Sequence, residues 1–276
     1  MAARGIRGAM GTVSLILIAG ATLLMLFVVL SGVRDHTPLN KSYFLRADTS
    51  SFPGSGRPES YWTFWKTCAT PGGSCGATVP AMPFGYAWVG GTEGVPTGLV
   101  GKHAKGTTST FYYYAWRFGW VFYLMGLVST GLTLLLSVAA PCSRLASGIC
   151  GASLAISLLW FSVGASLMTA TFVKARNEFR GAGISSSIGR YAFGFTWGAW
   201  ACIFLATIFL FLGCGASTNR KERYSVDDNV RNSTISRTGG PGGSIAFWKR
   251  QRHPSKRSTR GSFIDTENQH RVKDEY

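Results

Sequence analysis

Four long stretches without a charged side chain constrain the fold of this chain more than any other feature. They cover residues 11–33, 118–140, 145–173 and 191–219. An apolar run of about 18 residues or more can cross the hydrocarbon core of a bilayer as a helix. Only 14% of the residues are charged, whereas soluble domains carry about 25%. We therefore predict an all-α membrane protein with four transmembrane helices, in preference to helices buried in a soluble core.

The first apolar run is much longer than the ~7–15 residues of a signal-peptide core, which predicts a retained signal anchor. Four spans place both termini on the same side of the membrane. The segments we expect are a cytoplasmic N-terminus (1–10), membrane helices (11–33, 118–140, 145–173 and 191–216), an extracellular loop 1 (34–117), a cytoplasmic turn (141–144), an extracellular loop 2 (174–190) and a disordered basic cytoplasmic tail (217–276).

Charge counting gives conflicting answers about orientation. Loop 2 contains four cations against Glu178, and the short turn contains only Arg144, so this pair alone would put loop 2 in the cytoplasm. Basic residues near the termini favour the opposite orientation. They are Arg4, Arg7, Arg220, Lys221 and Arg223.

Two cysteines in loop 1 decide between these orientations. Cys68 and Cys75 flank a Pro-Gly-Gly turn, and such a pair can close a small disulfide loop. Disulfides persist in oxidising compartments, which favours an extracellular loop 1 and cytoplasmic termini. Metal binding is the alternative for two nearby thiols, but none of the four histidines has ligand spacing to this pair.

The aromatic residues before the cysteines extend this pattern. Trp62-x2-Trp65-x2-Cys68-x6-Cys75 resembles the Trp-Trp-Cys-Cys signature of claudin-like proteins. The resemblance implies a four-transmembrane-helix bundle with a small disulfide-stabilised extracellular β-sheet in loop 1, in which the disulfide pins two strands. We expect the tryptophans to lie at the membrane–water boundary, where an apolar ring with a polar N–H is favoured. The alternative is an interfacial aromatic cluster without a sheet.

Further motifs indicate a narrower family. They are Ser31-Gly32-x2-Asp35-His36-x-Pro38-x-Asn40, Ala47-Asp48-Thr49-Ser50, Pro80-Ala81-x-Pro83-Phe84 and Phe111-Tyr112-Tyr113-x3-Arg117-Phe118. Together with the tryptophan–cysteine pattern, they resemble the fungal Sur/PalI family of four-span plasma-membrane proteins associated with eisosomes. The resemblance covers the whole layout and is densest over residues 31–118.

The resemblance implies a non-enzymatic role in organising eisosome-associated domains of the fungal plasma membrane, with the protein in cortical patches. It also implies links to sphingolipid balance, endocytosis, cell-wall organisation and sporulation. The alternative is a membrane component of an ambient-pH sensing pathway, as in the PalI-like branch. The partners expected are membrane lipids, including sphingolipid-rich domains, further copies of the chain or eisosome proteins, and no nucleic acid.

The residue types in the apolar runs and loops also favour a non-enzymatic role. The four apolar runs contain no Asp, Glu, Lys, Arg or His, and ion-coupled transporters normally need ionisable groups at membrane depth. We find no nucleophile–base spacing, no phosphate loop and no metal-ligand cluster, so we expect no enzyme, no cofactor and no metal. A channel or transporter remains the alternative from a different class.

Small residues in the fourth apolar run suggest helix packing. Gly194, Gly198, Cys202 and Ala206 recur every four residues, and Gly194-x3-Gly198 permits close backbone approach. This stripe could serve either packing within one four-helix bundle or self-association of the chain into arrays.

Three residues at the ends of apolar runs have two interpretations each. Arg117 either snorkels to the lipid headgroups or donates hydrogen bonds to the loop-1 sheet. Cys142 and Cys214, at the predicted cytoplasmic edges, are palmitoylation candidates or buried small hydrophobes.

The tail contains a basic stretch mixed with aromatic residues. Such a stretch is attracted to anionic lipid of the inner leaflet by roughly 1 kcal/mol per charge, and the aromatic rings could insert at the interface. The predicted lipid-binding residues are Phe247, Trp248, Lys249, Arg250, Arg252, Lys256 and Arg257. A merely solvated basic tail is the alternative.

Overall fold

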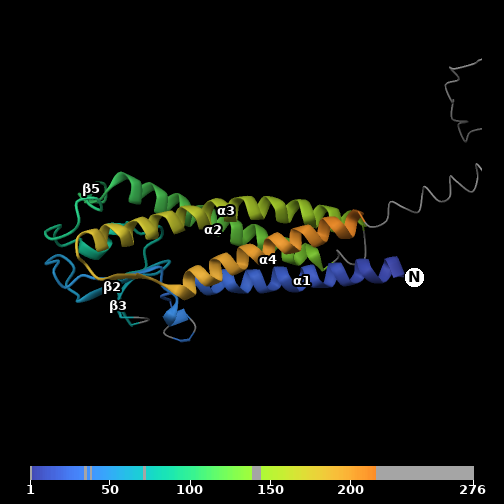
Figure 1. The fold of residues 1–276 in the computed structure, drawn as a ribbon, viewed down its shortest axis with the longest axis horizontal. Helices are drawn as coiled ribbons and strands as arrows, with labels where there is room; N and C mark the ends of the chain where they lie inside the picture. The colour runs from blue at the N-terminus through green and yellow to red at the C-terminus, as the bar shows by residue number, and fades with distance from the viewer. Residues whose placement is uncertain (1, 34–35, 38, 71–72, 139–143, 216–276) are drawn as a thin grey trace, which may run out of the picture. The chain divides into compact units, whose positions relative to one another are not determined.

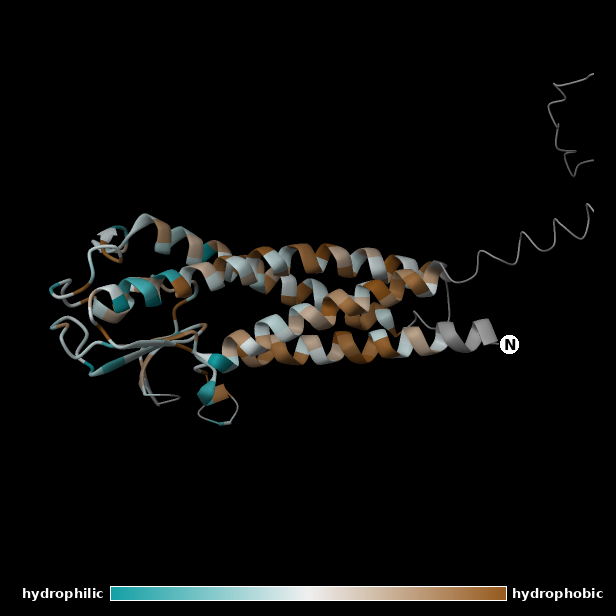
Figure 2. Cartoon of the chain, viewed as in Figure 1, coloured by the Kyte–Doolittle hydropathy of each residue, from teal (hydrophilic) through white to brown (hydrophobic). Residues whose placement is uncertain are grey.

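The computed structural model describes residues 2–33, 36–37, 39–70, 73–138 and 144–215. Four long helices run side by side in this part of the chain: α1 (Ala2–Val29), α2 (Thr110–Ser137), α3 (Arg144–Gly181) and α4 (Arg190–Gly215) (Figure 1). Each is long and apolar enough to cross a membrane. Hydrophobic residues concentrate along these helices, and hydrophilic ones gather at the end away from the N-terminus (Figure 2). The predicted four-helix architecture is confirmed.

The helices are longer than the charge-free runs. Helix α1 already begins at Ala2, and α2 begins at Thr110 rather than at residue 118. Helix α3 has 38 residues, which corresponds to ~57 Å at ~1.5 Å per residue and exceeds a ~30 Å hydrocarbon core. Residues 174–181 of the predicted loop 2 therefore belong to α3, and only residues 182–189 separate α3 from α4.

The helices pack mainly as two pairs, α2 with α3 and α1 with α4, with α3 also packing on α4. Glycines allow the first pair to approach closely. A Cβ at Gly164 of α3 would lie 2.6 Å from the backbone nitrogen of Tyr123, and one at Gly126 of α2 would lie 2.8 Å from the Cβ of Phe161. Contact between helices in lipid relies on such backbone approach because lipid removes the hydrophobic driving force.

Five of the strands in the described part of the chain form one antiparallel sheet, which lies at the end of the bundle away from the N-terminus (Figure 1). Its order is β4-β3-β2-β1-β7. The strands are β1 (Leu45–Asp48), β2 (Glu59–Trp62), β3 (Thr67–Thr70), β4 (Gly73–Cys75) and β7 (Ser186–Ile188). Strand β7 comes from the segment between α3 and α4, so the sheet joins both predicted extracellular loops. The sheet predicted in loop 1 is confirmed, but its edge strand from loop 2 was not expected.

Smaller elements complete this end of the molecule. They are the 3₁₀ helices η1 (Leu39–Lys41) and η2 (Phe84–Trp88) and a two-stranded parallel sheet of β5 (Gly101–Lys102) and β6 (Thr107–Thr108). We call the described residues of 39–109 together with β7 the cap.

Candidate functional site: the disulfide-linked cap

A disulfide joins Cys68 to Cys75, as predicted. The two residues lie directly opposite each other in the antiparallel pair β3–β4, with 3.9 Å between their Cα atoms. Strand β4 has only three residues and lies at the edge of the sheet. Because such a short strand has few hydrogen bonds of its own, the covalent link holds it in register.

We expect the double substitution Cys68→Ala, Cys75→Ala to lower the free energy of unfolding of the cap by about 2–3 kcal/mol. The bond closes a loop with a sequence separation of 7, and a short closed loop removes about this much chain entropy from the unfolded state. Thermal unfolding of the purified protein with and without reductant measures the effect. Cys202→Ser, at a half-buried free thiol, is the control, and an unchanged melting curve for the double variant would contradict the expectation.

Trp62 lies in the centre of the cap and not at a membrane–water boundary, which corrects the interfacial role that we expected. Only 2% of its surface is exposed. Its ring stacks on Phe84 with 5.1 Å between ring centroids, and its Nε1–H donates to the carbonyl oxygen of Phe84 at 3.0 Å. Trp88 and Phe179 complete its aromatic surroundings. The polar N–H is satisfied by the protein itself, so burial of the whole side chain carries no unpaired donor.

Trp65 connects the cap to the helices. Its Nε1–H donates to the carbonyl oxygen of Val29, the last residue of α1, at 2.6 Å, and its ring meets Trp120 of α2 edge-on at 5.1 Å. That carbonyl belongs to the last turn of α1, where carbonyls lack partners within the helix. Trp65 therefore caps the C-terminus of α1 and attaches the β2–β3 turn to it.

Ser31 and Gly32 explain the motif that follows the first apolar run. The hydroxyl of Ser31 accepts a hydrogen bond from the backbone N–H of Phe64 at 3.2 Å. Gly32 has a φ of +77°, and a Cβ there would lie 2.3 Å from Oγ1 of Thr63. Both the left-handed backbone and the contact with Thr63 require glycine.

Aromatic side chains continue the core of the cap into the helix bundle. Phe44, just before β1, stacks on Phe172 of α3 with 4.9 Å between centroids and also meets Trp116 of α2. Phe64 contacts Trp120 and Tyr123 of α2. The cap and the bundle thus share one hydrophobic core. A shared, close-packed core transmits displacement between its parts, so we infer that cap and helices move together.

Arg117 contacts Tyr113, one helical turn earlier. Its guanidinium carbon lies 4.1 Å from the ring centroid, within the range of a cation–π interaction. Its Nε has no hydrogen-bond partner in the described part of the chain. The expected donation to the loop-1 sheet is not among the hydrogen bonds that the described residues form, and snorkelling remains a prediction.

An ion pair and a phenol lie on one face of β1 and β2. The guanidinium of Arg46 donates to both carboxylate oxygens of Glu59, from Nε at 3.1 Å and from Nη2. The hydroxyl of Tyr61 donates to the same carboxylate at 2.7 Å. Arg46 and then Tyr61 hold the pKa of Glu59 below its usual range. Burial, and then its bond to Glu59, raise the pKa of Tyr61 to about 12.

We expect this pair to contribute stability that acid removes. A carboxyl whose pKa is lowered in the folded state stabilises the fold above its unfolded pKa of ~4.3, and the contribution is lost as the pH falls through the folded value. Because the two side chains are 46% and 33% exposed, we expect at most about 1 kcal/mol. The melting temperature of Glu59→Gln should lie slightly below that of the wild type at neutral pH, and the difference should vanish near pH 3. A difference that does not change with pH would contradict this.

The predicted small-residue stripe is not the buried face of α4. A Cβ at Gly194 would meet nothing within 4 Å, and one at Gly198 would meet only a side-chain atom of Leu24 at 3.6 Å. The fully buried positions follow a neighbouring stripe and include Ala206 from the predicted set. They include Ala192, Ala199, Ile203 and Ala206. Within the bundle, Gly194 therefore provides no close backbone approach, and self-association through this face stays a prediction.

Of the remaining predicted site residues, the structure describes Cys214 but neither Cys142 nor the tail. Cys214, near the end of α4, has its Sγ 3.5 Å from where a Cβ of Gly148 would lie, and its acylation stays a prediction. Cys142 and the lipid-binding residues of the tail lie outside the described residues. Within the described part, no group of three or more His, Cys, Asp or Glu residues could hold a metal ion.

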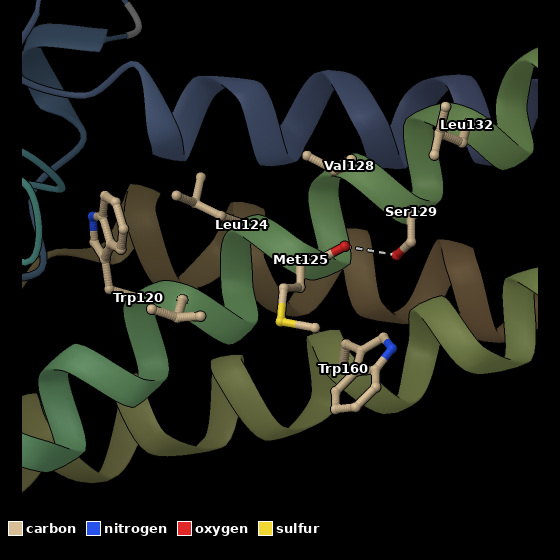
Figure 3. Close-up of a pocket in the computed structure, with 8 residues that line it drawn as sticks. Trp120, Leu124, Met125, Val128, Ser129, Leu132 and Trp160 are labelled. Carbon is tan, nitrogen blue, oxygen red and sulfur yellow. Dashed lines mark hydrogen bonds between the residues drawn. The ribbon is translucent and has the colours of Figure 1, made fainter.

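An apolar groove lies on the outer face of α2, next to α3 (Figure 3). Its volume is about 440 Å³, and it is lined by Trp120, Leu124, Met125, Val128 and Leu132 with Trp160 of α3, among others. The hydroxyl of Ser129 donates to the backbone carbonyl of Met125 at 2.7 Å. The groove thus presents hydrocarbon to its surroundings, as expected of a face that contacts lipid.

Comparison with known proteins identifies the family. A model of the SUR7/PalI family matches residues 10–209. Protein SUR7 of Candida albicans is 32% identical over 244 residues, which are 88% of each chain. Protein SUR7 of Saccharomyces cerevisiae is 28% identical over 231 residues, 82% of this chain and 73% of that protein. An uncharacterized plasma membrane protein of Saccharomyces cerevisiae is 28% identical over 192 residues, 67% of this chain and 62% of that protein. The chain therefore belongs to the SUR7/PalI family.

Proposed function

We propose that this chain is a non-enzymatic protein of the fungal plasma membrane that organises eisosome-associated membrane domains. The observation that carries the proposal is the single aromatic core shared by the cap and the four helices, exemplified by the stacking of Phe44 on Phe172. Such a body offers lipid and neighbouring proteins a fixed shape on two surfaces, the cap and the apolar belt. Links to sphingolipid balance, endocytosis, cell-wall organisation and sporulation are expected consequences of that role.

Family membership and one relative support the location. The relative from Saccharomyces cerevisiae is named as a plasma membrane protein. The disulfide in the cap favours the oxidising side of that membrane. With four spans, a cap outside the cell places both termini in the cytoplasm, where the basic tail would meet anionic lipid.

The apolar belt supports lateral contact with lipid in preference to transport. Its described exposed positions include many large hydrophobic side chains, such as Leu23, Val128, Leu135 and Ile156. Polar side chains in the spans mostly bond within the bundle: the hydroxyl of Ser147 donates to the carbonyl of Leu210, and the indole N–H of Trp200 donates to the hydroxyl of Ser162. These bonds hold helices together and leave little polar surface for a solute.

Imaging of a fluorescently tagged chain in living fungal cells, with recovery after photobleaching, tests the proposal. We expect static cortical patches with little recovery. Trp62→Ala should lose the patches among molecules that reach the plasma membrane, because it removes the centre of the shared core, whereas the lipid-facing Trp197→Ala should keep them. A uniform, rapidly recovering signal for the unaltered chain would refute the proposal. An ambient-pH signalling defect on deletion, without patches, would favour the PalI-like role instead.

A further inference from the structure

An open pocket of about 780 Å³ lies where the cap meets the start of α4. Three cationic side chains line it: Lys41 at the end of η1, Arg46 on β1 and Arg190 at the first position of α4. Two tyrosines, Tyr43 and Tyr191, also line it. Nothing in the proposed organising role uses this pocket.

The sheet holds the two sides of the pocket together. Strand β7 pairs with β1, and Ser187 lies opposite Arg46 in that pair. Gly189 then connects β7 to α4, and its N–H donates to the carbonyl oxygen of Phe44 at 3.0 Å. A Cβ at Gly189 would lie 1.7 Å from the carbonyl oxygen of Tyr43, so only glycine permits this approach. The cations of β1 and α4 are therefore placed by backbone contacts and not by flexible loops.

The positive charge of the pocket is only partly compensated. Glu59 neutralises the charge of Arg46, since Arg46 donates to both its carboxylate oxygens. Lys41 and Arg190 form no ion pair within the described residues. Arg190 also starts a helix of 26 residues, whose N-terminus has a partial positive charge and free N–H groups. The pocket is thus suited to an anion.

The position of the pocket indicates where that anion comes from. Arg190 directly precedes the apolar part of α4, whose candidate span is Arg190–Cys214, and Lys41 belongs to η1, the next element after α1. Tyr191 is half exposed, and tyrosines gather at the membrane–water interface. The pocket therefore adjoins the end of a candidate membrane span.

We propose that this pocket binds the phosphate group of a membrane lipid headgroup. Arg190 would donate paired N–H groups to the phosphate oxygens, and Lys41 would act as a compact point charge. The hydroxyls of Tyr43 and Tyr191 are neutral donors for the remaining oxygens. A volume of about 780 Å³ falls within the range of small-molecule sites. The proposal does not depend on the organising role or on the side of the membrane that the cap faces.

Lipid retention by the full-length chain tests this site. The protein is reconstituted in phosphatidylcholine nanodiscs that contain a minority of phosphatidylinositol, and retained phosphatidylinositol is counted by native mass spectrometry. Lys41→Gln, Arg190→Gln should reduce retention about tenfold, equivalent to about 1.4 kcal/mol. Lys102→Gln, Lys105→Gln makes the same charge change at exposed cap positions outside the pocket and should leave retention unchanged. The swap Lys41→Arg, Arg190→Lys keeps both charges and should retain the lipid.

Equal losses in the two glutamine variants, or no loss in the pocket variant, would overturn the proposal. The tail is identical in all variants, so its own lipid contacts cancel. A second arm distinguishes a lipid from a free anion: millimolar inorganic phosphate, added to the nanodiscs, should not displace phosphatidylinositol. Displacement by phosphate alone would show a free-anion site and would overturn the lipid assignment. Because Lys41 and Arg190 are exposed, overlapping melting curves are expected for all variants.

Discussion

Replacing Trp62 with alanine is expected to destabilise the folded chain by about 3–5 kcal/mol, the cost of removing a large aromatic side chain from a core. The ring is 2% exposed and stacks on Phe84 at 5.1 Å between centroids. Truncation leaves a cavity that the surrounding rings of Trp88 and Phe179 cannot fill without losing their own contacts. It also leaves the carbonyl of Phe84 without the indole N–H that it accepts, which adds to the cost.

Thermal unfolding of the purified protein measures this effect. Trp197→Ala is the matched control, because it removes the same side chain from a position on α4 that is 40% exposed. We expect the melting temperature of Trp62→Ala to fall by many degrees and that of Trp197→Ala to change little. Equal shifts for the two variants would show that the cap has no specific core around Trp62.

Replacing Gly164 with leucine is expected to cost about 3 kcal/mol or more, because the larger residue forces α2 and α3 apart. The added Cβ would lie 2.6 Å from the backbone nitrogen of Tyr123, and a backbone cannot rotate away as a side chain can. The hydroxyls of Tyr123 and Thr196 lie 3.3 Å apart in the buried interior, so a displaced α2 would also lose this bond to α4.

Gly131→Leu is the matched control on α2, because a Cβ there meets nothing within 4 Å. Melting curves and folded yield in detergent should separate the two variants clearly. If Gly164→Leu unfolds at the same temperature as Gly131→Leu, the close approach of α2 and α3 is wrong.

The sequence predicted the features that depend on local composition. Charge-free runs defined four helices because lipid excludes charge along the whole span. The disulfide between Cys68 and Cys75 could be predicted because a Pro-Gly-Gly turn lies between the two cysteines. The C-terminal end of α3 could not be predicted from the sequence, because a charged segment such as Lys174–Arg180 is compatible with either a loop or a helix in water.

Features that depend on distant contacts were missed. Strand β7 is Ser-Ser-Ile and pairs with β1, far away in sequence; three mostly polar residues give no strand signal of their own. The interfacial placement of Trp62 was wrong because an aromatic ring with an N–H suits a buried core with a carbonyl partner equally well. The four-residue spacing from Gly194 suggested a packing face, whereas Gly126 and Gly164, on two different helices, make close approaches. Only the pairing of α2 with α3 reveals that contact.

Accessibility of the cap from outside the cell tests the central claim most directly. A single cysteine is introduced at Glu93, an exposed turn position of the cap, and intact cells are treated with a membrane-impermeant maleimide; the unaltered chain serves as the control. A disulfide-linked cap outside the cell predicts labelling of Glu93→Cys before permeabilisation and none at Cys68 or Cys75 until reductant is added. Labelling of Glu93→Cys only after permeabilisation, or of Cys68 and Cys75 without reductant, would contradict the account.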